Sequence, residues 1–209
     1  MPGLSEAGQR EETELKIAIT GGIGAGKSYI GKLLKSMGYE VLDTDEIAKR
    51  LMAPGSPMEA RVLEAFGASI AGADGHLDRT ALLSLILEDS EARERLNRLT
   101  HPAIMEEAMA RCEAGRITFV EVPLLYEAGL DGLFDEVWVL TVPAEVRRSR
   151  LLARGMKPEA IQGLIEAQLT EAERLGRGGI PLEGDSPDLK EHVIALVKGL
   201  EMRMDGKQT

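Results

Sequence analysis

The chemistry of this sequence is concentrated first in residues 21–28, which read GGIGAGKS and match the pattern G-x-x-x-x-G-K-[ST]. Glycines at this spacing let successive backbone N–H groups turn toward one point and bind an anion. The Lys27 side chain can then reach the outer phosphates of a nucleotide, and the Ser28 hydroxyl can ligate Mg²⁺. The pattern therefore predicts a nucleoside triphosphate site formed by Gly21, Gly22, Ile23, Gly24, Ala25, Gly26, Lys27, Ser28 and Tyr29.

Such a loop binds phosphate when it lies between a buried strand and a helix, and the flanking residues predict both elements. Residues 15–20 are short, apolar and partly β-branched, as in a strand of a parallel sheet. After the loop, apolar residues recur every three or four positions on one helix face, and Gly38 can end that helix. These flanks, with Lys27 and Ser28, argue against a glycine-rich turn that merely joins a strand to a helix.

A second predicted strand, residues 39–42, ends in Asp43-Thr44-Asp45. Ligands of open parallel sheets bind at the carboxyl ends of the strands, so these acids are expected near the transferred phosphate. One of them can accept the proton of an attacking hydroxyl group, and Asp45 is the favoured candidate. Asp43 has two open interpretations, since it could instead cap the helix that begins near Ile47.

Further segments give the sequence a family resemblance. After GGIGAGKS come DTDEIAKRLMAPG with FG following, then DGHLDR, THPAI and VPLLYEAG, in an order that covers about residues 15–175. In this combination and order they resemble the dephospho-coenzyme A kinases. The resemblance implies transfer of the γ-phosphoryl group of ATP to the ribose 3′-hydroxyl of dephospho-CoA, with Mg²⁺ as metal cofactor and a small molecule as partner.

The resemblance also implies roles for individual residues. Asp45 would be the general base, and Asp43 would support the substrate or the metal shell. Arg79 and His101 match family positions near the acceptor. Two alternatives stay open. Arg79 could pair with the preceding aspartate on a surface turn, and His101 could be an N-cap or packing residue of a helix that begins at Pro102.

The second half of the chain supplies two more predicted strands, residues 117–122 and 136–142. Glu121 stands where many members of the family carry an acid that orients the Mg²⁺ shell, so Ser28 and Glu121 are the expected metal residues. The more common residue at that position is Asp. The longer Glu could act through a metal-bound water or serve another polar partner.

Three arginines form the densest basic cluster of the chain. Arg147, Arg150 and Arg154 are three and four residues apart, which places them on one side of a helix. The family has a mobile lid here, whose arginines neutralise transition-state charge. Arg150 and Arg154 match the family's R-x-x-x-R, which implies a catalytic role for Arg150 beside Lys27 and nucleotide binding by Arg154. Arg147 replaces the family's usual Gln, and its place on the same side of the helix makes it a further candidate for nucleotide binding. Alternatively, this side of the helix is solvated and pairs with nearby glutamates.

The last part of the lid and the nucleotide pocket depart from the family pattern. A second lid helix is expected over residues 158–175. It keeps Gln168, but it has Leu164 in place of the usual Arg and Arg174 in place of the usual Lys. The positions expected near the adenine are glycines in this chain, namely Gly178, Gly179 and Gly184. The nucleotide preference therefore stays open.

Composition excludes several other classes of protein. The 209 residues carry a net charge of −10 and include only three Phe, three Tyr and one Trp, which excludes a general nucleic-acid binder. The longest apolar runs are far shorter than a membrane span, no charged-then-apolar signal sequence opens the chain, and Cys112 is the only cysteine. We expect a cytoplasmic protein with no nucleic-acid or membrane partner, as a monomer or small homo-oligomer.

Together these patterns predict an α/β fold of the P-loop NTPase type, with three layers, a parallel sheet of about five strands, an inserted helical acceptor-binding lobe and a helical lid. The expected parts are a flexible tail at 1–14, a nucleotide-binding core at 15–45, 116–143 and 179–209, a lobe at 46–115 and a lid at 144–178. The expected activity is phosphorylation of dephospho-CoA. Two alternatives stay open, a P-loop kinase for another small hydroxylated metabolite and a nucleotide-binding regulator that transfers no phosphate.

Overall fold

A parallel sheet lies at the centre of the computed structural model, which describes residues 14–166 and 168–206. Its strand order is β2-β3-β1-β4-β5, and every neighbouring pair is parallel. The strands of the described chain are β1 (Leu15–Gly21), β2 (Glu40–Asp43), β3 (Ile117–Glu121), β4 (Glu136–Thr141) and β5 (Ile180–Glu183). The prediction of a parallel sheet of about five strands is confirmed, as are the four strands that the sequence located.

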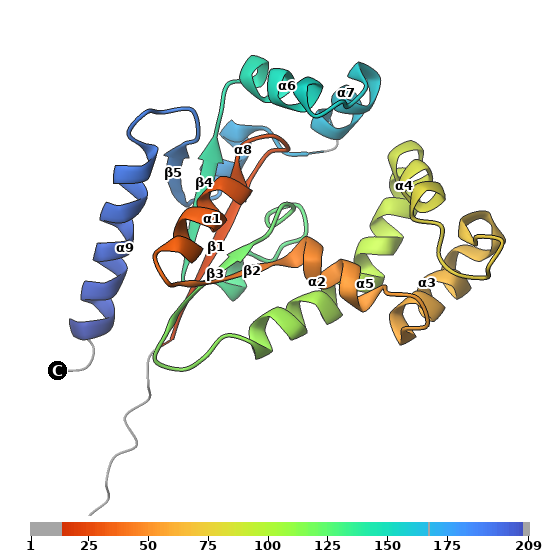
Figure 1. The fold of residues 1–209 in the computed structure, drawn as a ribbon, viewed down its shortest axis with the longest axis horizontal. Coiled ribbons are helices and arrows are strands. Elements are labelled where there is room, and N and C mark those ends of the chain that lie inside the picture. Colours follow the sequence, from red (N-terminus) through yellow and green to blue (C-terminus); the bar gives the residue numbers. More distant parts are fainter. Residues whose placement is uncertain (1–13, 167, 207–209) are drawn as a thin grey trace, which may run out of the picture.

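Helices cover both faces of the sheet, which gives three layers (Figure 1). On one face, α1 (Lys27–Ser36) and α9 (Leu189–Gly206) pack on strand residues such as Ile17 and Ile19. On the other face, the carboxyl half of α5 (Ser90–Ala110) packs around Ala18 and Val120. Adjacent residues of a strand point to opposite faces, so the apolar run of β1 contributes to both interfaces.

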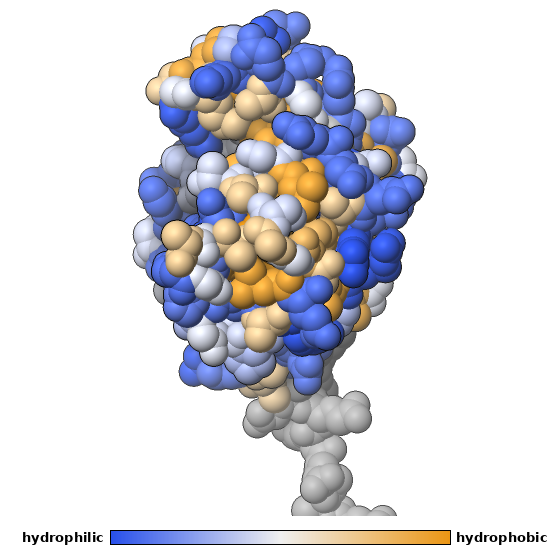
Figure 2. Space-filling model, turned by 90° about the vertical axis from the view of Figure 1, so that its right-hand side faces the viewer, coloured by the Kyte–Doolittle hydropathy of each residue, from blue (hydrophilic) through white to orange (hydrophobic). Residues whose placement is uncertain are grey.

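The helices between β2 and β3 form a lobe beside the sheet, at the right of Figure 1. They are α2 (Thr44–Leu51), α3 (Pro57–Phe66), α4 (Arg79–Glu88) and α5, with a 3₁₀ turn at Gly67–Ile70. Each α-helix begins after a side chain that accepts backbone amide hydrogens, and these caps are Asp43, Ser56, Asp78 and Asp89. Apolar side chains form a small core inside the lobe, and Figure 2 shows apolar surface left on its outer face.

Pro102 lies inside α5 and does not begin a helix, so the interpretation of His101 as an N-cap is wrong. The physical reason is that α5 has already begun at Ser90, where the Asp89 side chain accepts the first free amide hydrogens. His101 therefore lies within a helix of 21 residues, well away from either end.

The segment after β4 contains α6 (Ala144–Ala153), α7 (Pro158–Glu166) and α8 (Glu171–Gly176). The prediction of a single helix over 158–175 is wrong. Thr170 and Glu173 form a capping box, in which each side chain accepts the other's backbone amide hydrogen, and this box starts α8 as a separate helix. A second 3₁₀ turn, Asp131–Leu133, precedes β4.

The structure bears on the expected absence of a membrane span and on the expected N-terminal tail as follows. None of the described helices is both long and apolar enough to cross a membrane. Residues 1–13 of the expected tail lie outside the part of the chain that the structure describes. The division into core, lobe and lid stays a prediction.

Candidate active site

The loop between β1 and α1 has the backbone shape of an anion cradle. Gly24 and Gly26 have φ angles of 78° and 107°, in the left-handed region that favours glycine. Gly21 has no room for a side chain, because a Cβ there would lie 2.7 Å from the Leu140 carbonyl oxygen. No acidic residue occupies the first turn of α1, so the amide groups at the amino end of this helix remain electropositive. The loop therefore has the geometry of a phosphate-binding site.

Lys27, the first residue of α1, folds back over this loop. Its Nζ atom donates hydrogen bonds to the carbonyl oxygens of Gly21, at 2.7 Å, and Gly22, at 3.4 Å. Burial lowers the pKa of Lys27 to about 8, while the carboxylates of Asp45 and Glu121 act in the opposite direction. The Lys27 ammonium group therefore contacts the loop and, at the same time, interacts electrostatically with the Asp45 and Glu121 carboxylates.

The two aspartates after β2 have different environments. Asp43 accepts hydrogen bonds from the backbone N–H groups of Asp45, at 2.8 Å, and Glu46, at 3.4 Å, which confirms that it caps α2. Asp45 lies in the first turn of α2, accessible to solvent at the edge of a pocket. The surrounding protein atoms, and then the Asp43 carboxylate, raise the pKa of Asp45. The cap thus fixes Asp45 at the carboxyl edge of the sheet.

Glu121 ends β3 between α1 and the two aspartates. Its carboxylate lies against α1, where a Cβ on Gly31 would collide with the Oε1 atom. Its backbone oxygen accepts a hydrogen bond of 2.8 Å from the Thr44 hydroxyl, which ties β3 to the start of α2. Burial, and then the Asp43 carboxylate, raise the pKa of Glu121. Gly31 is therefore the residue that leaves room for this carboxylate beside α1.

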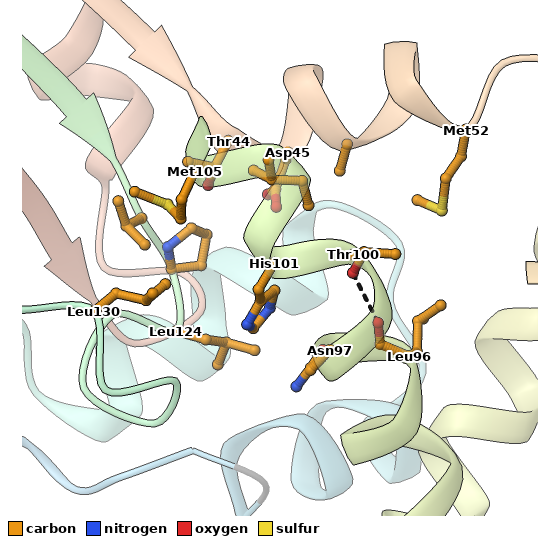
Figure 3. A pocket seen from close by; sticks show the side chains of 14 residues that line it. Thr44, Asp45, Met52, Leu96, Asn97, Thr100, His101, Met105, Leu124 and Leu130 are labelled. Carbon is orange, nitrogen blue, oxygen red and sulfur yellow. Dashed lines mark hydrogen bonds between the residues drawn. The ribbon is translucent and has the colours of Figure 1, made fainter. Parts of the chain in front are cut away.

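A pocket opens beside Asp45, between α2, α5 and the segment that follows β3 (Figure 3). The labelled residues in its mostly apolar wall are Thr44, Met52, Leu96, Asn97, Thr100, His101, Met105, Leu124 and Leu130. In Figure 3, Asp45 approaches from the start of α2, and the His101 ring extends from α5. Burial lowers the pKa of His101, so the ring is neutral near pH 7. The pocket can enclose an apolar ligand that carries a few polar groups.

Arg79 does not line this pocket but binds the backbone of a residue that does. Its Nη2 atom donates hydrogen bonds to the carbonyl oxygens of Lys49, at 3.1 Å, and Met52, at 3.0 Å, at the end of α2. The Asp78 carboxylate instead caps α4, so the alternative of a surface pair between Asp78 and Arg79 is wrong. Because Met52 lines the pocket, Arg79 is linked to it through the end of α2.

The arginines of α6 lie near the phosphate loop. Arg150 donates hydrogen bonds to backbone carbonyl groups and so links α6 to the loop. The accepting oxygens, at 3.1 to 3.3 Å, belong to Gly24, Ala25 and Gly184. Arg147 reaches the backbone of Gly22, where its guanidinium fills the space of a side chain. Arg154 lines a second pocket beside the loop.

Two of the three glycines after α8 that were expected near the adenine, Gly179 and Gly184, have a packing reason. Gly179 has a φ of 123°, and a Cβ there would lie 2.8 Å from the side chain of Val139 on the sheet. A Cβ on Gly184 would lie 2.7 Å from the Ala25 carbonyl oxygen of the phosphate loop. Gly184 also lines the second pocket, together with Tyr29. Beside the second pocket, the loop is therefore in close contact with the backbone at Gly184.

Three further residues beside the loop were missing from the predicted site. Gln168 accepts a hydrogen bond of 2.8 Å from the Ile23 backbone N–H. Glu127 forms an ion pair of 2.9 Å with Arg174, which is buried near Gly22. The VPLLYEAG segment and the retained Gln168 were signals that could have found two of them. For Arg174 the signal was weaker, since it was only the replacement of the family's usual Lys, and its place beside the loop depends on the fold.

The fold and the site together define a P-loop kinase, with a parallel sheet, a glycine loop that leads into a helix starting with Lys-Ser, and carboxylates at the adjoining strand ends. The family model for dephospho-CoA kinase matches residues 15–188. The chain therefore belongs to the dephospho-CoA kinase family and is an ATP-dependent phosphotransferase.

Known relatives agree over nearly the whole chain. The dephospho-CoA kinase of Moorella thermoacetica is 40% identical over 197 residues, which cover 90% of this chain and 93% of that protein. A crystal structure from Thermus thermophilus is 32% identical, with a TM-score of 0.76, and the match covers 91% of this chain and 97% of that one. The dephospho-CoA kinase from Campylobacter jejuni, 23% identical with a TM-score of 0.63 over 90% of this chain and 98% of its own, has the same fold.

Proposed function

We propose that this chain transfers the γ-phosphoryl group of ATP to the ribose 3′-hydroxyl of dephospho-CoA, giving CoA and ADP. The observation that carries the proposal is the position of Asp45, which lines the apolar pocket and is electrostatically coupled to Lys27 on the phosphate loop. An acceptor in that pocket and a triphosphate on that loop would meet at this carboxylate. Membership of the family supports the identity of the acceptor.

Asp45 accepts the proton of the attacking hydroxyl group. Asp43 holds it in place through the helix cap, and the raised pKa of Asp45 brings it nearer the pH at which a general base is efficient. His101 and Arg79 serve the acceptor side. The neutral His101 ring can donate or accept one hydrogen bond inside the pocket, and Arg79 fixes the pocket wall through the Met52 carbonyl.

The phosphates are held by the loop of residues 21–29 and by the basic side chains around it. Lys27 and Arg147 act at the start of the loop, and Arg150 and Arg154 act on the side of the second pocket. Their positive charges stabilise the charge that spreads over the transferred group. Arg150 binds loop carbonyls in this structure, so its action on phosphate requires these bonds to be exchanged when the lid moves.

The residues present fit a magnesium ion. Mg²⁺ is usually held by one or two protein groups together with phosphate oxygens and waters. Within residues 14–166 and 168–206, no cluster of three Asp, Glu, His or Cys side chains is arranged to hold a metal by itself. Ser28 and Glu121 would hold the ion, and the Asp43 carboxylate, which raises the pKa of Glu121, makes a nearby cation favourable. When bound, Mg²⁺ supplies neutralisation of phosphate charge.

The parts of the chain take matching roles. Residues 46–115 receive the acceptor, residues 144–178 act as the lid, and the remaining described segments bind the nucleotide. The free thiol of Cys112 suits a cytoplasmic enzyme, and we propose that the enzyme acts as a monomer or small homo-oligomer.

A coupled ADP-release assay with MgATP tests this function. Dephospho-CoA, adenosine, shikimate and CoA are supplied in separate reactions, and CoA is the matched control because its 3′-hydroxyl already carries phosphate. We expect ADP release with dephospho-CoA alone, and CoA as the product by mass spectrometry. Release driven by another acceptor, or ATP binding without any release, would contradict the proposal.

A further inference from the structure

Arg174 is among the largest side chains that the fold buries completely, with a relative exposure of 0%. Its Nη2 atom pairs with Glu127 at 2.9 Å, but among the described residues its Nε and Nη1 atoms have no hydrogen-bond partner. A buried N–H group without an acceptor is destabilising, and more so when it belongs to a charged side chain. The two N–H positions therefore indicate a ligand with acceptor oxygens.

Arg147 repeats this pattern nearby. Its Nε atom is also buried and has no hydrogen-bond partner in the described part of the chain, and the Glu171 carboxylate lies 3.7 Å away. The two guanidinium groups meet at Gly22. A Cβ built there would collide with Nη1 of Arg147 and would lie 3.6 Å from Nη1 of Arg174. Both arginines thus end beside the first part of the phosphate loop.

Lys27 brings a third positive charge to the same place. Its Nζ atom binds the carbonyl oxygens of Gly21 and Gly22, and the charge of Arg174 is close enough to lower its pKa. We call Lys27, Arg147 and Arg174 the Gly22 cation cluster. In a chain with a net charge of −10, cations gathered at one point with unused donors mark a place for an anion.

Glu127 fixes the direction of Arg174. Its Oε1 atom accepts hydrogen bonds of 2.9 Å from Nη2 of Arg174 and from the Leu169 backbone N–H. Leu169 follows Gln168, whose side chain accepts the Ile23 N–H, so the carboxylate is anchored where the lid joins the loop. The ion pair therefore orients the guanidinium and leaves its Nε and Nη1 atoms for another acceptor.

We propose that Arg174, together with Arg147, binds the terminal phosphate of the nucleoside triphosphate, and that Glu127 is the positioning residue for Arg174. This inference rests on the proposed function of the loop as a triphosphate site. It deepens that function by assigning a residue outside the motif, and outside α6, to the phosphate that is transferred.

The position of the cluster along the loop selects the terminal phosphate. The later glycines, Gly24 and Gly26, line the second pocket with Tyr29, and this pocket shares no lining residue with the acceptor pocket. Lys27, in the cluster, is instead coupled to Asp45 at the edge of the acceptor pocket. A triphosphate that runs from the second pocket toward Asp45 therefore ends at the Gly22 cation cluster.

Equilibrium binding of ATP and ADP to the full chain, without acceptor, tests the inference. Arg174→Met should weaken ATP binding about 10- to 100-fold, because a charge-assisted two-point contact is lost, and should change ADP binding by less than about threefold. Arg174→Lys should give an intermediate loss, since Lys keeps the charge but not the fork of donors. Arg177→Met, in the same segment but bound to the Tyr126 carbonyl, is the control and should leave both affinities unchanged.

Two further variants separate binding from folding. In Arg174→Ala, added guanidinium ion should recover ATP affinity by at least about threefold, because it supplies the missing donors, whereas a folding defect would not respond. Glu127→Gln should weaken ATP binding less than Arg174→Met does, because the neutral amide orients the guanidinium less strongly. Failure of guanidinium to recover any ATP affinity in Arg174→Ala would count against the inference.

Other outcomes would overturn the inference directly. Equal weakening of ATP and ADP would mean that Arg174 holds an inner phosphate or the loop itself. Unchanged ATP affinity would also overturn it, and a raised KM for dephospho-CoA in the same variant would assign the anion to the acceptor. The binding measurement contains no acceptor, so a negative ADP-release assay with dephospho-CoA would refute the proposed function without altering this result.

Discussion

The nucleotide side and the acceptor side of the proposed active site are built from different parts of the polypeptide. On the nucleotide side, backbone amides, constrained glycines and basic side chains surround the loop of residues 21–28. On the acceptor side, apolar side chains of α2 and α5 line a pocket with Asp45 at its edge. Main-chain atoms cannot move aside as side chains can, so the loop tolerates few substitutions. Single side chains of the pocket wall can be substituted with smaller effects on the rest of the site. Mutations should therefore separate nucleotide binding, acceptor binding and transfer.

The largest effect is expected at Asp45, where the two sides meet. Asp45→Ala should lower kcat by about 100-fold or more because the proposed general base is lost, while the dissociation constant for ATP changes by less than about threefold. Rapid-quench kinetics and equilibrium ATP binding measure the two quantities. Glu46→Ala, which removes the next carboxylate and only its exposed pair with Lys49, is the control. Near-normal turnover in Asp45→Ala would remove Asp45 from the role of base.

A smaller effect should follow from a single methyl group on the nucleotide side. Gly31→Ala would push the Glu121 carboxylate away from α1 and should lower kcat by about 10-fold, in the range seen when groups that support a metal site are disturbed. Raising the Mg²⁺ concentration should recover part of the loss. Gly199→Ala on α9, where a Cβ meets nothing within 4 Å, is the matched control. A Mg²⁺ dependence identical to that of the unaltered chain would contradict the metal role of Glu121.

On the acceptor side, His101→Leu should raise the KM for dephospho-CoA by about tenfold, which corresponds to the loss of one hydrogen bond inside a closed pocket. The KM for ATP should stay constant because His101 lies away from the phosphate loop. Steady-state kinetics with each substrate varied in turn provide the measurement, and Arg98→Leu, on the exposed side of the same helix, is the control. A changed KM for ATP would show that the two sides are not separable at His101.

The smallest effect should be the pH dependence of nucleotide binding. Lys27 has a pKa of about 8, so it is charged below that pH and loses its proton above it. Only the charged form attracts phosphate, and the dissociation constant for ATP should therefore rise about fivefold between about pH 7 and pH 8.6. Isothermal titration calorimetry at several pH values checks this rise. Lys27→Arg should show a flat profile, and an equal rise in that variant would assign the titration to another group.

The nucleotide side was largely predictable because its determinants are local in the sequence. The motif specifies glycines, Lys27 and Ser28 in consecutive positions, and the apolar strand and helix on either side confirm its context. Asp45 could be located for a similar reason, since it lies two residues after the end of β2. The role of Asp43 stayed open, because an aspartate at the start of a helix suits both a cap and a reactive group.

The rest of the site depends on contacts that sequence spacing does not record. Pro102 favours the start of a helix, but the cap at Asp89 had already started α5, so the N-cap alternative for His101 was wrong although the residue does line the pocket. Thr170 starts α8 by a capping box that the apolar pattern of residues 158–175 does not reveal. Arg174 reaches the loop only through the packing of α8 against the sheet, and a change from the family's usual Lys did not indicate its burial.

The strand order has a consequence for how the chain is made. Within the described residues β1 comes first along the chain, yet it lies between β3 and β4 in the sheet, and its register pairs Leu15 with Ile117. The ribosome adds about 5–20 residues per second, so β1 waits on the order of 5–20 s for its first neighbouring strand. The lobe, whose helices contact one another locally, can fold during that wait. Until β3 emerges, the apolar strand that carries the phosphate loop has unpaired edges open to association with other nascent chains.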